Sequence, residues 1–152
     1  MIMKIRIFFI FILCLLFSCE KEEDGSQDPN ATYFRCVIGG NEFEDLNPQA
    51  SLSLSNDLLT IDVSDNTYTL STKIYFFSTR NQGDTVFFST PNMAVLNDGN
   101  SLFSNEYDQP YGTLILTDLD EDKMSGTFSF KVYDSNGVKI NISNGEFQNI
   151  TY

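Results

Sequence analysis

The stretch that decides the fold is Ser125-Gly-Thr-Phe-Ser-Phe-Lys-Val-Tyr133, followed by Asp134-Ser-Asn-Gly137. Phe128, Phe130 and Val132 alternate with polar residues, and a period of two predicts a β-strand with one buried face. The Asn136-Gly137 pair favours the positive φ angles of a tight hairpin turn. This stretch therefore predicts an antiparallel hairpin.

The returning strand of the hairpin is predicted to place Val138, Ile140 and Ile142 on its inward face. The Asn144-Gly145 pair is expected to interrupt this strand, because both residue types favour turns. Residues 146–152 then form the last strand of the chain.

The same alternation recurs along the rest of the domain, and no long segment has a helical period. Further strands are expected at residues 33–38, 42–44, 52–54, 59–63, 68–77, 85–88 and 111–117. Residues 91–111 contain Pro91, Gly99 and Pro110 and are expected to form short edge strands or a loop.

Short strands joined by Gly, Asn and Asp turns predict an all-β fold, specifically an antiparallel β-sandwich of roughly 8–10 strands. The alternative is a closed, calycin-like barrel, because consecutive hairpins can also form an up-and-down meander. The 14 Phe and 7 Tyr residues supply the core that a chain without Trp needs.

The N-terminal residues have the features of a secretory signal. Lys4 and Arg6 are followed by 11 almost wholly apolar residues at positions 7–17, whereas a membrane-spanning helix needs roughly 20. The sequence therefore predicts a signal peptide at residues 1–18, an acidic flexible tether at 19–31 and one monomeric all-β domain at 32–152.

Leu16-Phe17-Ser18-Cys19 resembles the lipobox of bacterial lipoproteins, in which a small residue precedes a lipidated cysteine. The resemblance implies that the Cys19 thiol receives diacylglycerol, that the chain is cleaved before Cys19, and that the new amino group is acylated. Two or more acyl chains hold a protein stably on a bilayer. Phe17 departs from the pattern, which has a smaller residue there. An ordinary signal peptide, with Cys19 a free or disulfide-bonded cysteine, is the alternative.

The acidic run Glu20-Lys-Glu-Glu-Asp24 resembles the export tag of surface-exposed lipoproteins of the Bacteroidota. This resemblance implies a domain that is anchored to the outer membrane and exposed at the cell surface. The alternative is a solvated linker on a lipoprotein that faces the periplasm.

Composition narrows the possible functions. The net charge is −12, and it becomes −14 once Lys4 and Arg6 leave with the signal, so the domain repels nucleic acid. Without His, a Ser-His-Asp triad, a Cys-His dyad and an imidazole metal site are excluded. Cys36 is predicted to be a buried apolar side chain rather than a reactive thiol. No cofactor is expected.

Three segments near the C-terminus are Gly112-Thr-Leu-Ile-Leu-Thr-Asp118, Ser125-Gly-Thr-Phe-Ser-Phe130 and Ile142-Ser-Asn-Gly-Glu-Phe147. They are similar to a family of small Bacteroidota lipoproteins that is known only as a domain of unknown function, and the Ile38-Gly-Gly-Asn-Glu-Phe43 hairpin fits the family loosely. The resemblance implies a β-rich, outer-membrane-anchored domain with no known activity, in which the glycines and phenylalanines of the motifs are structural.

Three aspartates, Asp118, Asp120 and Asp122, form a candidate weak calcium site. Lys123 and Ser129 stand where a calcium-binding loop needs a glycine and a bidentate glutamate, so a solvated hairpin tip is the alternative.

Two further features concern sugars. Asp84-Thr85-Val86 resembles a bacterial O-glycosylation acceptor, which makes Thr85 a candidate modification site. The candidate stacking platforms for a bound sugar are Tyr75, Tyr107, Tyr111 and Tyr133. Aromatic residues in strands also form core or cross-strand pairs, and the lack of Trp argues against a sugar-binding module.

We therefore expect a cell-envelope lipoprotein whose domain binds or displays something without catalysis. Its contact with the lipid bilayer is through acylated Cys19, and the sequence does not identify its ligand or protein partner. The alternatives are a structural or assembly partner of an outer-membrane complex, and a hydrolase that uses paired carboxylates.

Overall fold

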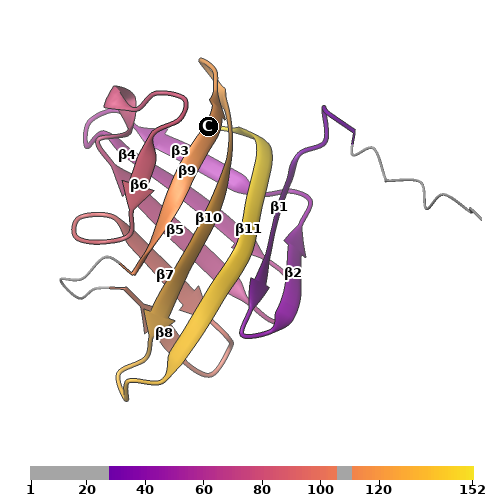
Figure 1. The fold of residues 1–152 in the computed structure, drawn as a ribbon, viewed down its shortest axis with the longest axis vertical. Helices are drawn as coiled ribbons and strands as arrows, with labels where there is room; N and C mark the ends of the chain where they lie inside the picture. Colours follow the sequence, from indigo (N-terminus) through magenta and orange to yellow (C-terminus); the bar gives the residue numbers. More distant parts are fainter. Residues whose placement is uncertain (1–27, 106–110) are drawn as a thin grey trace, which may run out of the picture.

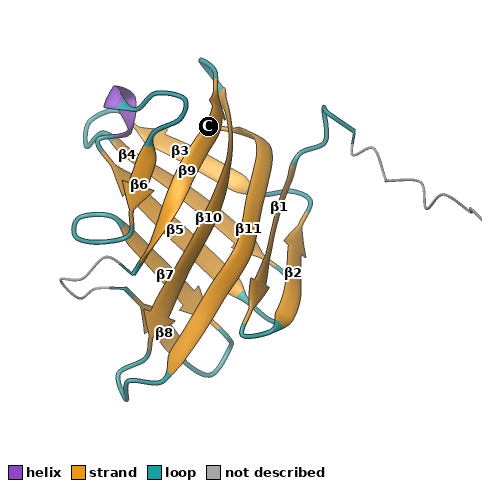
Figure 2. Ribbon diagram, in the orientation of Figure 1, coloured by secondary structure: helices purple, strands orange, loops and turns teal. Residues whose placement is uncertain are grey.

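Eleven strands and one short 3₁₀ helix make up residues 28–105 and 111–152, the part of the chain that the computed structural model describes (Figures 1 and 2). In chain order they are β1 (Tyr33–Ile38), β2 (Asn41–Asp45), β3 (Gln49–Ser53), β4 (Leu58–Ser64), β5 (Thr69–Tyr75), η2 (Phe77–Thr79), β6 (Thr85–Phe87), β7 (Met93–Asn97), β8 (Leu102–Ser104), β9 (Gly112–Leu119), β10 (Lys123–Tyr133) and β11 (Lys139–Thr151).

The strands form a single antiparallel sheet in the order β2-β1-β11-β10-β8-β7-β5-β4-β3, with β9 paired to β10 and β6 paired to β9. In Figure 1, strands β6, β9, β10 and β11 lie in front of β3, β4, β5 and β7. Strand β10 belongs to both layers, since it pairs with β9 along most of its length and with β8 at Tyr133.

The predicted antiparallel all-β fold is confirmed. The two facing layers expected of a sandwich are present, but they are continuous through β10, so the sheet curls into an open half-barrel. The strands at the two ends of the path, β2 and β3, are joined by residues 46–48 and do not pair with each other. The strand count is 11 instead of 8–10 because residues 91–111 contribute two strands.

The faces predicted for the central hairpin are confirmed, since Phe128, Phe130 and Val132 are buried. Eight phenylalanines in the described residues are buried in one core: Phe34, Phe43, Phe77, Phe88, Phe103, Phe128, Phe130 and Phe147. The inward position predicted for Val138 is wrong, because this residue precedes β11 and is 55% exposed. It closes the hairpin turn instead, where its backbone N–H donates to the carboxylate of Asp134 at 2.7 Å.

The predicted break at Asn144-Gly145 is also wrong, because β11 runs unbroken from Lys139 to Thr151. Asn144 has a left-handed φ of 52° and forms a β-bulge, and the registers with both β1 and β10 shift at this point. Asn is among the few residues that tolerate this conformation, and a bulge bends its strand, which helps the sheet to curl.

The stretch that the sequence left as edge strands or a loop contains β7 and β8, and both lie inside the sheet between β5 and β10. Two buried asparagines organise it. Asn92 accepts the N–H of Tyr75 at 2.9 Å and donates to the carbonyl of Phe87 at 3.0 Å. Asn105 accepts the N–H of Ala94 and donates to the carbonyl of Asn92 at 3.3 Å. These side chains replace ladder hydrogen bonds that the irregular backbone does not make.

Candidate functional site

The outer face of the front layer carries three adjoining hollows, which we call the outer furrow. The hollow over β1 and β2 has a volume of about 300 Å³, the one over β9, β10 and β11 about 460 Å³, and the one toward Tyr111 about 520 Å³. Asn144 lines the first and second hollows, and Ser129 lines the second and third. The three hollows therefore adjoin one another along the outer face of the sheet.

The floor of the outer furrow carries Lys131 and six uncharged polar side chains: Thr113, Thr127, Ser129, Asn141, Ser143 and Asn144. They lie outward because strand positions alternate, and the bulge turns the consecutive residues Ser143 and Asn144 both toward solvent. None of the six side chains makes a hydrogen bond to another of the described residues, so their donors and acceptors are available to a ligand.

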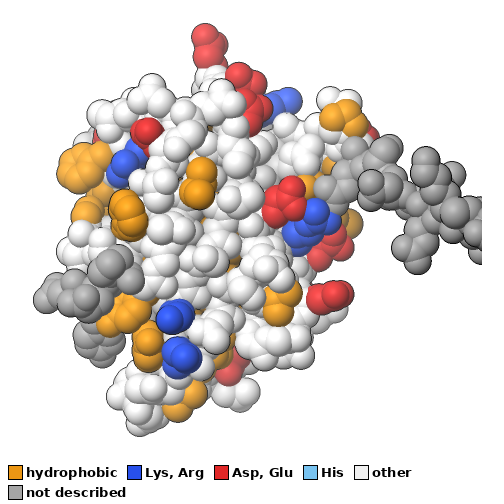
Figure 3. All heavy atoms as spheres, in the orientation of Figure 1, with side chains coloured by type: hydrophobic (Ala, Val, Ile, Leu, Met, Phe, Trp, Pro, Cys, Tyr) orange, Lys and Arg blue, Asp and Glu red, His pale blue; other side chains and the backbone are white. Residues whose placement is uncertain are grey.

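Charge is distributed unevenly over the molecule. Strands β9, β10 and β11 together contain three lysines, one aspartate and one glutamate, a net charge of +1 in a chain of net charge −12. In Figure 3, the surface over these strands is mainly white, and the acidic side chains gather at the upper tip and at the right-hand side. The outer furrow is thus a nearly neutral surface on a strongly acidic protein.

One side of the furrow is bordered by a polar cluster on β1 and β11. The guanidinium of Arg35 donates to Oε2 of Glu146 from Nη2 at 2.6 Å and from Nε at 3.2 Å. The Tyr33 hydroxyl lies 2.9 Å from Oε1 of Glu146 and from Oε1 of Gln148, and the Arg35 guanidinium is 4.8 Å from the Tyr33 ring. The hydrogen bond from Arg35 lowers the pKa of Glu146, while burial raises the pKa of Tyr33.

The Glu146 carboxylate is expected to stabilise the fold modestly. Replacing Glu146 with Gln should lower the free energy of unfolding at neutral pH by up to about 1 kcal/mol, because both partners are well exposed to screening solvent. The pKa of Glu146 lies below its usual 4.5 only in the folded state. This contribution is therefore complete above about pH 5 and is lost as pH falls through the lower, folded-state pKa.

Urea unfolding at several pH values measures this effect. The midpoints of the wild type and of Glu146→Gln should differ at pH 7 and converge toward pH 3. Glu44→Gln is the matched control, since Glu44 faces Arg35 from β2 but its carboxylate makes no hydrogen bond among the described residues. If the difference in midpoint between the wild type and Glu146→Gln stayed constant down to pH 3, the ionisation of Glu146 would not contribute to stability.

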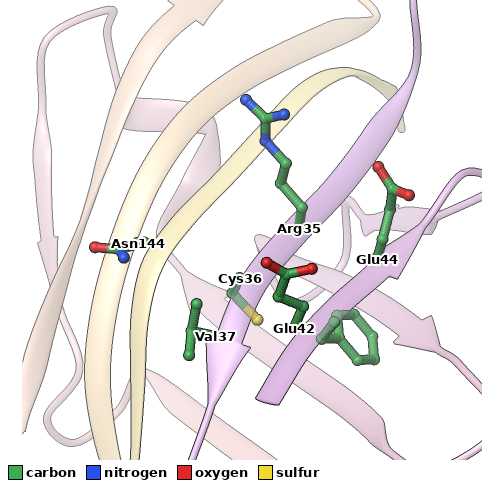
Figure 4. Close-up of a pocket in the computed structure, with 7 residues that line it drawn as sticks. Arg35, Cys36, Val37, Glu42, Glu44 and Asn144 are labelled. Carbon is green, nitrogen blue, oxygen red and sulfur yellow. The ribbon is translucent and has the colours of Figure 1, made fainter. Parts of the chain in front are cut away.

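The hollow over β1 and β2 is shown in Figure 4, where the side chains of Arg35, Glu42 and Glu44 spread around the hairpin and Asn144 projects from β11. Cys36 belongs to the opposite, inward face of β1 and is 5% exposed. Burial raises the pKa of its thiol to about 12, which leaves it protonated at neutral pH. The prediction that Cys36 is a buried apolar side chain is confirmed.

Two of the tyrosines proposed as stacking platforms meet at the far end of the furrow. The rings of Tyr111 and Tyr133 are 5.3 Å apart in an edge-to-face arrangement, and both are partly exposed. Tyr75 lies at the end of β5 in the rear layer, away from this pair. Tyr107 lies outside the described residues.

Asp118, Asp120 and Asp122 all lie exposed at the β9–β10 turn. Within residues 28–105 and 111–152, no three Asp, Glu, Cys or His side chains approach closely enough to hold a metal ion. Thr85 is exposed at the start of β6, a strand that pairs with β9 at the edge of the described sheet. Its hydroxyl is therefore accessible to a modifying enzyme, and its glycosylation stays a prediction.

No family model, curated protein or solved structure matches this chain. The resemblance to the Bacteroidota lipoprotein family, which rests on the C-terminal motifs, therefore stays a prediction. The signal peptide, the lipidation residue Cys19 and the acidic run 20–24 lie outside the described residues. Among the described residues, no helix has the length and apolar character to cross a membrane.

Residues 29–32 are docked onto the end of β11. Gln148 and Asn149 donate from their side-chain amides to the carbonyl of Pro29 at 2.9 and 2.8 Å, and Asn149 also donates to the carbonyl of Ala31 at 3.1 Å. Asn149 itself has a left-handed φ of 51°, and its N–H donates to the Ser125 hydroxyl at 3.1 Å. The point at which the N-terminal segment leaves the domain is thus fixed. Sequence reasoning missed this contact, because nothing in the pattern links residue 29 to residue 149.

Proposed function

We propose that the chain is a cell-envelope lipoprotein, anchored in the outer membrane by acylated Cys19, whose β domain is a non-enzymatic binding module. The Ser18-Cys19 junction after the short apolar segment carries the proposal of the anchor. The docking of Pro29 is compatible with this anchor, since nine residues separate Cys19 from Pro29. A tether of this length reaches at most about 36 Å, which keeps the domain close to the membrane.

The outer furrow supports the proposal of binding. Its floor offers several unbonded polar side chains, which suits recognition. The carboxylates that line it at β2, Glu42 and Glu44, are exposed, whereas a catalytic acid usually owes its raised pKa to burial. We therefore favour a binding module over the carboxylate-based hydrolase.

An assembly partner of an outer-membrane complex is the second candidate. It is favoured by Phe87 and Ile115, which are 54% and 40% exposed on neighbouring strands β6 and β9. Two apolar side chains make only a small patch, and interfaces of stable complexes bury much larger areas. We therefore rank this candidate below a binding module for a small or linear ligand.

The position of the domain is tested by adding protease to whole cells. The wild-type domain is expected to be degraded, because the tether holds it outside the cell. Replacing Glu20 to Asp24 with Ala should leave lipidation intact, since the lipobox precedes Cys19, yet the substituted protein should be protected until the outer membrane is permeabilised. Equal protease access for both proteins would mean that the acidic run is only a solvated linker.

A further inference from the structure

We propose that the outer furrow binds a linear, uncharged oligosaccharide. This inference rests on the proposed binding function and names the class of ligand that the furrow takes.

The backbone of Asn144 first indicates that this surface is functional. A non-glycine residue in the left-handed region costs conformational energy, and bulges often redirect a side chain beside a binding site. Here the bulge turns the Asn144 amide outward at the junction of two hollows. The amide makes no hydrogen bond to any other described residue, so the bulge gives it no structural partner there.

The hydrogen-bonding capacity of the floor fits a polyhydroxylated ligand. Hydroxyl groups of Ser and Thr both donate and accept, and the amides of Asn141 and Asn144 offer both functions as well. The backbone groups of β9, β10 and β11 are already paired within the sheet, so an extended peptide cannot add as a new strand across this face. A ligand must therefore bind through side chains, as a sugar can.

Apolar groups lie where the less polar faces of sugar rings would pack. Ile115 lines the middle hollow, and Phe87 is beside it on β6. At the far end, Tyr111 lines the third hollow and is held edge-to-face by Tyr133. The exposed part of the Tyr111 ring can therefore stack against a sugar ring, the role that tryptophan often has in sugar-binding proteins.

Charge complementarity selects an uncharged ligand. Lys131 lines the third hollow, and Glu146, which lines the middle hollow, is paired with Arg35, so the furrow carries little net charge over β9, β10 and β11. A polyanion would be repelled by the acidic residues at both ends of this face, Glu42 and Glu44 on β2 and the carboxylates of the β9–β10 turn. A polycation would be attracted by Glu42 and Glu44 at the β2 end of the furrow but repelled by Lys131 in the third hollow. The serial arrangement of three adjoining hollows favours a linear chain over a compact ligand.

The test is a calorimetric titration of the full-length chain, purified in a detergent without a sugar headgroup. The probes are linear hexasaccharides of glucose, mannose and xylose, with hexagalacturonate as the acidic comparison. At least one uncharged hexasaccharide is expected to bind, and at least ten-fold more tightly than hexagalacturonate. Absence of binding by every uncharged probe at millimolar concentration, or tighter binding of hexagalacturonate, would overturn the proposal.

Two variants separate binding from folding. Asn144→Gly should keep or increase stability, because glycine adopts the left-handed backbone without strain, and should weaken binding about five-fold or more by removing the amide. Ser129→Trp should abolish binding by filling the junction of two hollows, whereas Thr69→Trp, at an exposed position of β5 in the rear layer, should not change it. Unchanged affinity in both furrow variants would overturn the site.

The result of the sugar-binding test does not depend on whether Cys19 is lipidated. A protein that binds the hexasaccharide but carries no lipid on Cys19 would refute the proposed anchoring and leave the furrow proposal standing. A lipidated protein that captures only a protein partner through Phe87 and Ile115 would refute the furrow proposal and favour the assembly role.

Discussion

Replacing Gly145 with alanine is expected to lower the free energy of unfolding by about 3 kcal/mol, at the upper end of the cost of overpacking a core. A Cβ atom at this position would fall on the ring of Phe128. That ring is 5% exposed and lies 4.7 Å from the ring of Phe34, so it has no free space into which to move. A domain of this size is stable by only about 5–15 kcal/mol, so much of its stability would be lost.

The same arrangement occurs one step along the hairpin. Gly126 faces Phe147 and Gly145 faces Phe128 across the β10–β11 pair, so each glycine leaves room for the ring opposite. A Cβ atom on Gly126 would lie 2.5 Å from both the Ile115 carbonyl oxygen and Cζ of Phe147. Since a carbonyl in the sheet moves less readily than a side chain, Gly126→Ala is expected to be at least as damaging as Gly145→Ala.

Urea unfolding of the full-length chain, followed by circular dichroism, measures these losses. Ser129→Ala is the control, because this exposed position on the same strand should change stability by less than about 0.5 kcal/mol. Adding Phe128→Leu to Gly145→Ala should recover part of the loss by shortening the side chain that clashes. If Gly145→Ala alone unfolds within about 0.5 kcal/mol of the wild type, the proposed ring contact does not constrain the fold.

These pairs show what the sequence could and could not predict. Alternation identified the two strands and assigned a structural role to the motif glycines and phenylalanines, because a period of two is visible in one segment at a time. The register that places Gly126 opposite Phe147 depends on the pairing of two strands. It also depends on the bulge at Asn144, which the pattern predicted as a break. A residue that favours turns has the same local signature whether it ends a strand or bulges within it.

The interior position of β7 and β8 could not be predicted for a related reason. Pro91 and several asparagines gave this stretch a loop-like composition. In the fold, Asn92 and Asn105 are 8% and 1% exposed and bond to backbone groups of neighbouring strands. Sequence alone does not distinguish an asparagine that caps a turn from one that replaces a missing ladder bond inside a sheet.

The candidate site was predictable only in its parts. Alternation placed Thr127 and Ser129 outward, and Tyr111 and Tyr133 were among the four tyrosines considered for stacking. Their assembly into one furrow requires β9, β10 and β11 to be neighbours, and the order of strands in a sheet is a long-range property. The low charge of these three strands was present in the sequence, but its meaning depends on their forming one continuous surface.

Replacing Cys19 with alanine is expected to abolish lipidation completely. The proposed chemistry forms a thioether at the Cys19 thiol, and alanine has no nucleophilic atom there. In lipoproteins with a lipobox, the signal peptide is cleaved only after lipid transfer to the cysteine. The variant should therefore retain residues 1–18 and migrate as a longer precursor. Without acyl chains, the mature domain would also lose its stable membrane attachment.

Metabolic labelling with an azido fatty acid, followed by a click reaction and gel fluorescence, measures the loss. Cys14→Ala is the matched control, because Cys14 lies inside the apolar segment after Leu13 and lacks the small preceding residue of a lipobox. It should label as strongly as the wild type, and so should Cys36→Ala, since the Cys36 thiol is buried and protonated.

Equal labelling of Cys19→Ala and the wild type would refute the lipoprotein assignment. Loss of label from Cys14→Ala with retention in Cys19→Ala would move the modification into the apolar segment. Labelling lost from Cys19→Ala alone would fix the anchor at the residue that begins the tether.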